Sequence, residues 1–238
     1  MVFFKYPSQI DKNIFNSEFQ SKAFYGLPIE VTFCKECVIS NQRPSSAIEF
    51  KNHSKIKKQT INFNSDGICD ACKAKSLKQE INWQERENQL RELCNKYRKK
   101  DGGYDCLIPG SGGKDSFMQA HLLKYKYKMN PLTCTWAPHI CTTWGWKNFQ
   151  SWIHAGFDNI LFTPNGRVHR LITRLAIENL FHPFQPFILG QKNLAPKIAD
   201  KYDIPLIFYG ENEAEYGNPL ADMSNAERSW DFFSSSGE

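Results

Sequence analysis

Residues 107–116 read LIPGSGGKDS, and the rest of the chain can be interpreted outward from this stretch. Two apolar residues lead to a proline and three glycines, and two serines, a lysine and an aspartate complete the pattern. Glycines allow a backbone to approach an anion closely, and the N-terminus of a following helix offers free N–H groups and a positive dipole end. A strand, this loop and a helix in that order predict a polyphosphate-binding site.

The loop departs from two common phosphate-binding motifs. A Walker A loop has Ser or Thr directly after its lysine, whereas Asp115 follows Lys114 here. Asp115 also stands where the dinucleotide-binding fingerprint has its third glycine. The remaining match is S-G-G-x-D-S over residues 111–116. The alternative interpretation is an ordinary glycine–serine turn that opens a helix and is capped by Ser111 or Asp115.

Segments of strand and helix character alternate around this loop. The pattern predicts strands over 104–109, 131–138, 159–163 and 205–209, and helices over 114–126, 148–155, 168–180 and 188–202. Such alternation implies right-handed crossovers and a mainly parallel, doubly wound α/β sheet with helices on both faces. Ligands bind these sheets at the carboxyl ends of strands, where the glycine loop begins.

Four of the eight cysteines form two C-x2-C pairs, Cys34 with Cys37 and Cys69 with Cys72. Two such pairs supply the four thiolates of a closed tetrahedral zinc site, whose role is structural because no coordination position stays open. Iron–sulfur or redox chemistry is the alternative. The residues around the pairs have little apolar bulk, so a metal would supply the missing stability.

The motifs and the composition predict how the chain is divided, where it is located and where its charge lies. We expect an N-terminal arm and cysteine module over 1–78, a linker helix over 79–100, and an α/β domain over 101–238 that is incomplete at its C-terminal end. Neither a secretory signal nor an apolar run of the ~20 residues that a membrane helix needs is evident, which predicts a cytoplasmic location. Residues 1–100 carry 18 Lys/Arg against 11 Asp/Glu, a surplus that suits either an acidic partner or a solvated face. Its densest candidates are Lys55, Lys57 and Lys58.

An acidic stretch, GENEAEYG at residues 210–217, follows the last expected strand. Three carboxylates within five residues repel one another unless cations neutralise them, and magnesium bound to ATP phosphates is the natural cation. Glu211 and Glu213 are the candidate residues. The alternative is an exposed acidic turn.

The glycine loop resembles that of the PP-loop ATP pyrophosphatase superfamily, whose members cleave ATP between the α and β phosphates and transfer AMP to a substrate oxygen. With the cysteine pairs and the acidic stretch in this order, the chain resembles the bacterial N-acetyl sugar amidotransferases. These are associated with acetamidino sugars, such as derivatives of pseudaminic acid, in lipopolysaccharide and flagellin glycans. Members of that family continue past the equivalent of Glu238, so the resemblance implies an N-terminal portion.

The resemblance also implies a site and a reaction. ATP, Mg²⁺ and a structural Zn²⁺ are the implied cofactors, and an N-acetyl sugar is the implied substrate. AMP on the acetamido oxygen would turn that oxygen into a leaving group for ammonia to displace. Lys114 and Asp115 would assist through charge balance or magnesium geometry, together with Glu211 and Glu213. The implied pyrophosphate-binding residues are Ser111, Gly112, Gly113, Lys114, Asp115 and Ser116.

We expect that this chain cannot make ammonia from glutamine by itself. No cysteine has glycines two residues away on both sides, and Val2 follows Met1, so neither common glutaminase design is present. The resemblance implies a separate glutaminase subunit and a cyclase-like subunit that delivers ammonia. Two other functions fit parts of the sequence: a tRNA-thiolating PP-loop enzyme that uses Cys134 and Cys141, and a nonenzymatic zinc-ribbon module that binds nucleic acid.

Overall fold

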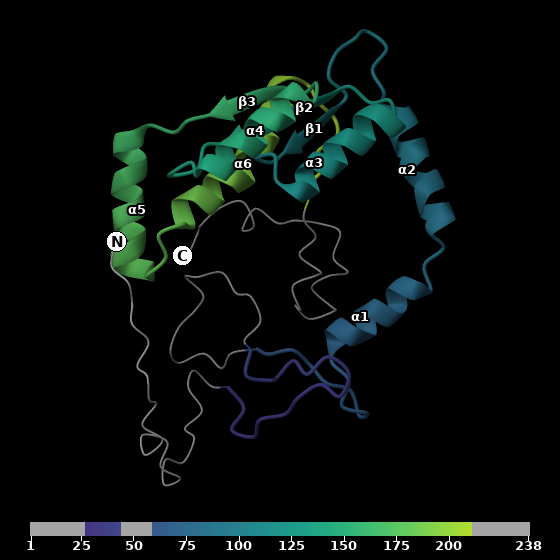
Figure 1. The fold of residues 1–238 in the computed structure, drawn as a ribbon, viewed down its shortest axis with the longest axis vertical. Coiled ribbons are helices and arrows are strands. Elements are labelled where there is room, and N and C mark those ends of the chain that lie inside the picture. Colours follow the sequence, from purple (N-terminus) through teal and green to yellow (C-terminus); the bar gives the residue numbers. More distant parts are fainter. Residues whose placement is uncertain (1–26, 44–58, 211–238) are drawn as a thin grey trace.

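The computed structural model describes residues 27–43 and 59–210 (Figure 1). Two helices lead from the cysteine pairs into a domain in which strands and helices alternate. In chain order the elements are α1 (Asp70–Gln79), α2 (Trp83–Tyr97), β1 (Cys106–Pro109), α3 (Lys114–His121), the π-helix η3 (Leu122–Lys126), β2 (Pro131–Trp136), α4 (Thr143–His154), β3 (Asp158–Phe162), α5 (Gly166–Leu180) and α6 (Gln185–Lys201).

The three strands form a parallel sheet in the order β1-β2-β3. On the other edge of β1, the N–H of Leu107 donates to the carbonyl of Leu206 at 2.8 Å, and the N–H of Phe208 donates to the carbonyl of Leu107 at 2.9 Å. The strand expected over 205–209 is thus reduced to one parallel bridge at Ile207. Because the chain leaves β1 toward β2 and returns on its other side, a topological switch point lies at the carboxyl end of β1.

Helices cover both faces of the sheet, which confirms the α/β fold class (Figure 1). Ile108 of β1 packs on one face, in a buried cluster with Trp152 of α4. Leu107 points to the other face, in a cluster with Leu194 of α6. Alternate residues of the strand therefore belong to two separate hydrophobic clusters, as expected where a parallel sheet is buried on both sides.

α6 lies close to the sheet because Gly190 has no side chain. A Cβ on Gly190 would lie 2.2 Å from the ring of Trp136, so the indole rests directly on the helix backbone. Trp136 also stacks on Phe162 of β3, with ring centroids 4.9 Å apart. This contact fixes the spacing between α6 and the carboxyl end of β2.

The helix expected over 79–100 corresponds to α2, which starts four residues later than expected and ends at Tyr97. The additional helix α1, which ends at Gln79, was not expected. α2 begins after Asn82 because the Asn82 Oδ1 accepts the N–H of Glu85 at 3.1 Å and caps the new helix. The helix expected from residue 148 starts earlier for a similar reason, since the Thr142 hydroxyl caps α4 by accepting the N–H of Gly145.

The cysteine module, residues 27–43 and 59–79, has a small core. Its buried residues are Cys34, Ile61, Cys69 and Cys72. Cys69 directly precedes α1, and its sulfur accepts the N–H of Cys72 at 3.5 Å. Along the described stretches of chain, no helix combines the length and apolar character that crossing a membrane requires.

Candidate functional site

A cavity of about 1010 Å³ opens where β1 and β2 end. Its size is at the upper end for small-molecule sites. The glycine loop after β1 forms one side, the loop 137–142 with the start of α4 forms another, and α6 closes the third. Its wall includes Ser111, Gly113, Asp115, Ser116, Cys134, Thr135, Ile140, Cys141, Trp146, Gln191, Leu194, Tyr209 and Gly210.

The N-terminus of α3 opens toward this cavity. Gly113 occupies the N-cap position, and no side chain of the described residues caps the helix. By contrast, Asn82, Thr142 and Asn165 cap α2, α4 and α5 through their side-chain oxygens. The backbone N–H groups of the first turn, which no side chain caps, and the positive dipole end of α3 make this terminus suited to an anion.

The three glycines of the loop have different roles. A Cβ on Gly110 would lie 2.4 Å from the Cβ of Ser116, and a Cβ on Gly112 would lie 2.5 Å from the carbonyl oxygen of Asn148. Gly112 also has a left-handed φ of +81°. A Cβ on Gly113, however, would meet no atom within 4 Å. Gly110 and Gly112 are therefore required for packing, whereas Gly113 leaves open space beside the helix terminus.

The polar residues of the loop are arranged around that space. Ser116 is buried, and its hydroxyl donates to the carbonyl of Gly113 at 3.2 Å. The Lys114 Nζ forms an exposed ion pair with the Asp115 Oδ1 at 2.7 Å. Of the six residues predicted to bind ATP, the cavity wall contains Ser111, Gly113, Asp115 and Ser116; Gly112 and Lys114 belong to the same loop without lining the wall.

The segment beyond the Ile207 bridge completes the loop side of the cavity. Gln119 of α3 donates its Nε2–H to the carbonyl of Tyr209 at 2.9 Å. Gly210 follows, and a Cβ there would lie 2.9 Å from the backbone nitrogen of Ser116. Burial raises the pKa of the Tyr209 phenol. Glu211 and Glu213 lie outside the described residues, as do Lys55, Lys57 and Lys58; Gly210, which directly precedes Glu211, lines the cavity.

The remaining cysteines fall into two groups. Cys94 and Cys106 are buried in the core. Cys134 and Cys141 both line the cavity. Burial raises the pKa of the Cys134 thiol to about 12, so this sulfur stays protonated at neutral pH and is a poor nucleophile. Cys141 is exposed at the rim.

Three aromatic residues of the cavity wall, Trp136, Trp146 and Phe187, are not among the predicted site residues. Their positions carried a usable signal, because Trp136 ends a strand and Trp146 stands at the start of a helix in a parallel α/β fold. Two histidines nearby, His139 and His169, lie against each other with ring centroids 4.6 Å apart. Neither of them belongs to the described cavity wall.

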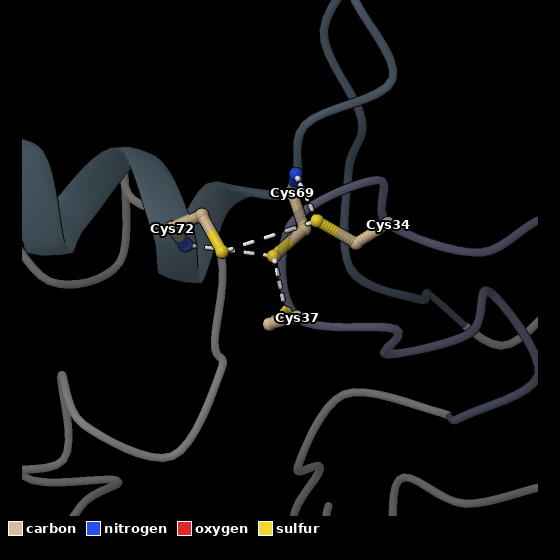
Figure 2. Close-up of side chains that lie close together, drawn as sticks. All are labelled: Cys34, Cys37, Cys69 and Cys72. Atoms are coloured by element: carbon tan, nitrogen blue, oxygen red, sulfur yellow. Dashed lines mark hydrogen bonds between the residues drawn. The ribbon is translucent and has the colours of Figure 1, made fainter.

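The four paired cysteines converge on one point, as Figure 2 shows. All four sulfurs lie within 4.8 Å of one another. The Cys34 and Cys72 sulfurs are 3.9 Å apart, and those of Cys37 and Cys69 are 3.5 Å apart. A tetrahedral zinc ion with Zn–S bonds of about 2.3 Å places its sulfurs about 3.8 Å apart. The donor set and spacing therefore fit zinc, and the residues that would hold it are the predicted four.

Backbone N–H groups prepare this cluster for thiolates. The N–H groups of Cys69 and Glu36 donate to the Cys34 sulfur at 3.3 and 3.4 Å. Burial alone would raise the pKa of Cys34, but these backbone donors, together with that of Cys37, outweigh it and lower the pKa to about 6. Burial raises the pKa of Cys72. Four thiols this close cannot all ionise without a cation, so a bound divalent metal would take the place of their protons.

Comparison with known proteins gives partial matches. No protein-family profile matches the chain. The uncharacterized protein MJ1599 of Methanocaldococcus jannaschii is 36% identical over 80 residues, which make up 34% of this chain and 28% of that protein. The chain thus spans less than a third of the length of this curated relative.

Two solved structures show a limited likeness. The NH3-dependent NAD synthetase of Campylobacter jejuni aligns with a TM-score of 0.39 and 13% identity, over 53% of this chain and 56% of that one. A predicted subunit of tRNA methyltransferase from Methanocaldococcus jannaschii aligns with a TM-score of 0.36 and 24% identity, over 54% and 59% of the two chains. Each alignment covers little more than half of either partner.

Proposed function

We propose that the chain binds ATP through the N-terminus of α3 and transfers AMP to the acetamido oxygen of an N-acetyl sugar, so that ammonia can replace this oxygen and give an acetamidino sugar. The observation that carries the proposal is the uncapped N-terminus of α3, which follows a glycine loop and opens into a cavity large enough for two substrates. The choice of sugar and reaction rests on the sequence resemblance.

The proposed reaction balances in two steps. The acetamido oxygen attacks the α-phosphorus of ATP, and the bond to the β-phosphate breaks, releasing pyrophosphate. Ammonia then adds to the activated carbon, the C–O bond to AMP breaks, and a proton is lost to give the amidine. An amide carbonyl is a poor electrophile, and adenylation converts its oxygen into a good leaving group. The protein contributes mainly by orienting the reactants and neutralising phosphate charge.

Within this proposal the loop residues have distinct roles. The backbone beside Gly113 and the hydroxyls of Ser111 and Ser116 would hold the β- and γ-phosphates. Asp115 is the one acidic residue of the cavity wall across the described ranges, so it would face the magnesium ion that accompanies ATP. Glu211 directly follows the wall residue Gly210 in sequence, Glu213 comes two residues later, and both would serve the same ion.

Zinc would have a structural role. None of the four clustered cysteines is found in the wall of the cavity as the structure describes it. A four-thiolate site is also coordinatively closed and leaves no position for a substrate. When bound, the ion would stabilise the module from which α1 and α2 lead to the sheet.

Replacing Gly113 tests the nucleotide site without disturbing the fold. Gly113→Val adds a branched side chain whose Cβ would meet no atom within 4 Å, so the protein should stay folded while ATP affinity falls by about ten-fold or more. Gly166→Val is the matched control, because Gly166 also lies at a helix N-terminus in open space but belongs to α5, away from the cavity. Calorimetric titration with ATP should separate the two variants, and equal affinities would remove the loop from the mechanism.

The reaction itself is tested with ¹⁵N-ammonium. The protein is incubated with ATP, magnesium and candidate N-acetyl sugars, and the sugars are analysed by mass spectrometry. We expect ¹⁵N in the product, with AMP and pyrophosphate as the nucleotide products. Incorporation should rise with pH as more NH3 is present. Unlabelled glutamine should replace ammonium only when a glutaminase subunit and a cyclase-like subunit are added. ADP as the nucleotide product would contradict the proposal.

One observation favours a second candidate, the thiolation of tRNA. Cys134 and Cys141 both line the cavity, and sulfur transfer requires cysteines near the adenylate. Cys141→Ala separates the two functions. In an amidotransferase this exposed residue should be replaceable with little loss of ¹⁵N incorporation, whereas in a tRNA-thiolating enzyme its loss should abolish sulfur transfer. The high pKa of Cys134 favours the first outcome.

A further inference from the structure

The cavity has two parts that differ in burial. Its inner part lies where β2 meets α6 and is lined by the buried residues Cys134, Thr135 and Leu194. Its outer wall lies on the loop 137–142, the start of α4 and the outer side of α6. There Ile140 is 84% exposed and Trp146 is 48% exposed. A flat nucleobase would bury most of its surface in this inner part, which leaves the outer wall for the second substrate.

Trp146 presents a fixed aromatic face in this outer wall. Its backbone N–H donates to the carbonyl of Thr142 at 2.9 Å, which places it in the first turn of α4. Its ring packs on Phe149 with centroids 5.7 Å apart and planes tilted by 31°. One side of the indole is therefore supported by the helix, while about half of the residue stays accessible from the cavity mouth.

The same helix ties this face to the glycine loop. The carbonyl of Asn148, two residues after Trp146, lies against Gly112, where a Cβ would come within 2.5 Å. Gly112 packs directly on the backbone of α4, the helix that carries Trp146. A substrate that rests on Trp146 is thus held at a constant position relative to the phosphate-binding terminus of α3, as transfer between two bound reactants requires.

Resting on the proposed function, we propose that this outer wall is the sugar subsite and that Trp146 is its specificity-determining residue. A pyranose ring has an apolar C–H face, which an electron-rich indole face attracts, and hydroxyl groups around its edge, which stay hydrated at an open mouth. Gln191 of α6, also in the cavity wall, offers both an amide donor and an acceptor, which matches the two polar groups of an acetamido substituent.

The chain provides a matched control two residues away. Trp144 lies on the same turn of α4 but outside the cavity wall, with the Lys147 Nζ 4.6 Å from its ring centroid. Trp144→Ala and Trp146→Ala remove the same side chain from the same helix. Any difference between them in sugar binding reports the cavity and not the stability of α4.

The experiment measures sugar and nucleotide binding separately. Saturation-transfer NMR with free N-acetylglucosamine, in the presence of ATP and magnesium, reports contact through the acetyl methyl and ring protons. Trp146→Ala should weaken sugar binding by about ten-fold, and Trp144→Ala should leave it unchanged. Calorimetric affinity for ATP should be the same in both variants and in the wild type. Gln191→Ala should reduce the acetyl methyl signal more than the ring signals.

Three results would overturn the subsite. These are equal sugar binding by Trp146→Ala and wild type, no sugar signal from the wild type, and a loss of ATP affinity in Trp146→Ala, which would assign the indole to the nucleobase. Failure of the proposed function has a different signature, since the wild type would then bind no ATP in calorimetry whether or not Trp146 contacts the sugar.

Discussion

The cysteine module and the α/β body, residues 101–210, fold by different means. Three of the four buried residues in the core of the module are cysteines, with Ile61 as the fourth. The body instead buries two clusters, one on each face of its sheet, around residues such as Trp152 and Leu107. The module should therefore depend on its metal and the body on apolar burial, and the two dependences should be separable by mutation.

The largest effect is expected from a metal ligand. Cys72→Ser should release zinc and unfold the module, because metal binding supplies about 10–16 kcal/mol in zinc-finger peptides. Hydrogen exchange should show loss of protection over residues 59–79 while β1 and β2 stay protected, and elemental analysis should show less than one zinc per chain. Cys94→Ala, on α2 but buried in the same cluster as Trp152, is the control that should keep the metal. Wild-type protein without zinc, or with a coloured iron chromophore, would refute the zinc assignment.

A core truncation in the body should have the second largest effect. Trp152 is fully buried, and Trp152→Ala should lower the free energy of unfolding by about 3–5 kcal/mol. Trp144→Ala, on the exposed side of α4, should change it little. Urea titration of both variants gives the difference. Zinc content should stay at one per chain in both, and loss of zinc from Trp152→Ala would show that the two regions do not fold independently.

Within the glycine loop, stability and binding should separate. Gly112→Ala forces a side chain into a left-handed conformation and against the Asn148 carbonyl, which should cost about 1–3 kcal/mol of stability. Gly113→Ala should leave the unfolding midpoint unchanged and weaken ATP binding. Thermal unfolding followed by calorimetry with ATP distinguishes the two. A Gly112→Ala protein as stable as wild type would mean that the loop adopts another conformation in solution.

The smallest effect concerns pH. Burial, and then the charge of His139, lower the pKa of His169, so the folded state resists its protonation. Above the ordinary histidine pKa both states are neutral and stability should not depend on this group. As pH falls through about 6.5, the unfolded state binds a proton that the folded state does not, and stability decreases. His169→Gln should flatten this decrease in urea midpoints measured from about pH 7.5 to about pH 5.5. An unchanged slope would exclude His169 as its source.

The features that were predictable from sequence are those set by neighbouring residues. The glycine loop is recognisable from ten consecutive residues, and the strand and helix on either side of it are predicted from apolar patterning. The cysteine pairs are equally local, and the structure brings all four sulfurs together. The parallel sheet followed from the alternation of these segments. In each case the prediction rests on a short residue pattern or on the order of such patterns along the chain.

The features that were missed depend on single side chains or on partners far away in sequence. The start of α2 at Trp83, four residues after the expected start, depends on one capping side chain, that of Asn82. The position of Trp146 at the start of a helix indicates the edge of the sheet that binds ligands, but the opposite wall of the cavity comes from α6, more than 30 residues further along the chain. The strand expected over 205–209 shrinks to one bridge because Ile207 finds a partner on one side, in Leu107, among the described residues.

The bridge between Leu107 and the segment around Ile207 has a consequence for synthesis on the ribosome. β1 and the glycine loop emerge long before Leu206 and Phe208, whose backbone groups complete the open side of β1. Until then one edge of β1 remains unpaired, and unpaired strand edges can pair with other chains. The nascent protein would carry a nearly finished phosphate loop beside an exposed strand edge. Slower elongation before residue 206 should therefore lengthen the period in which the chain needs protection from aggregation.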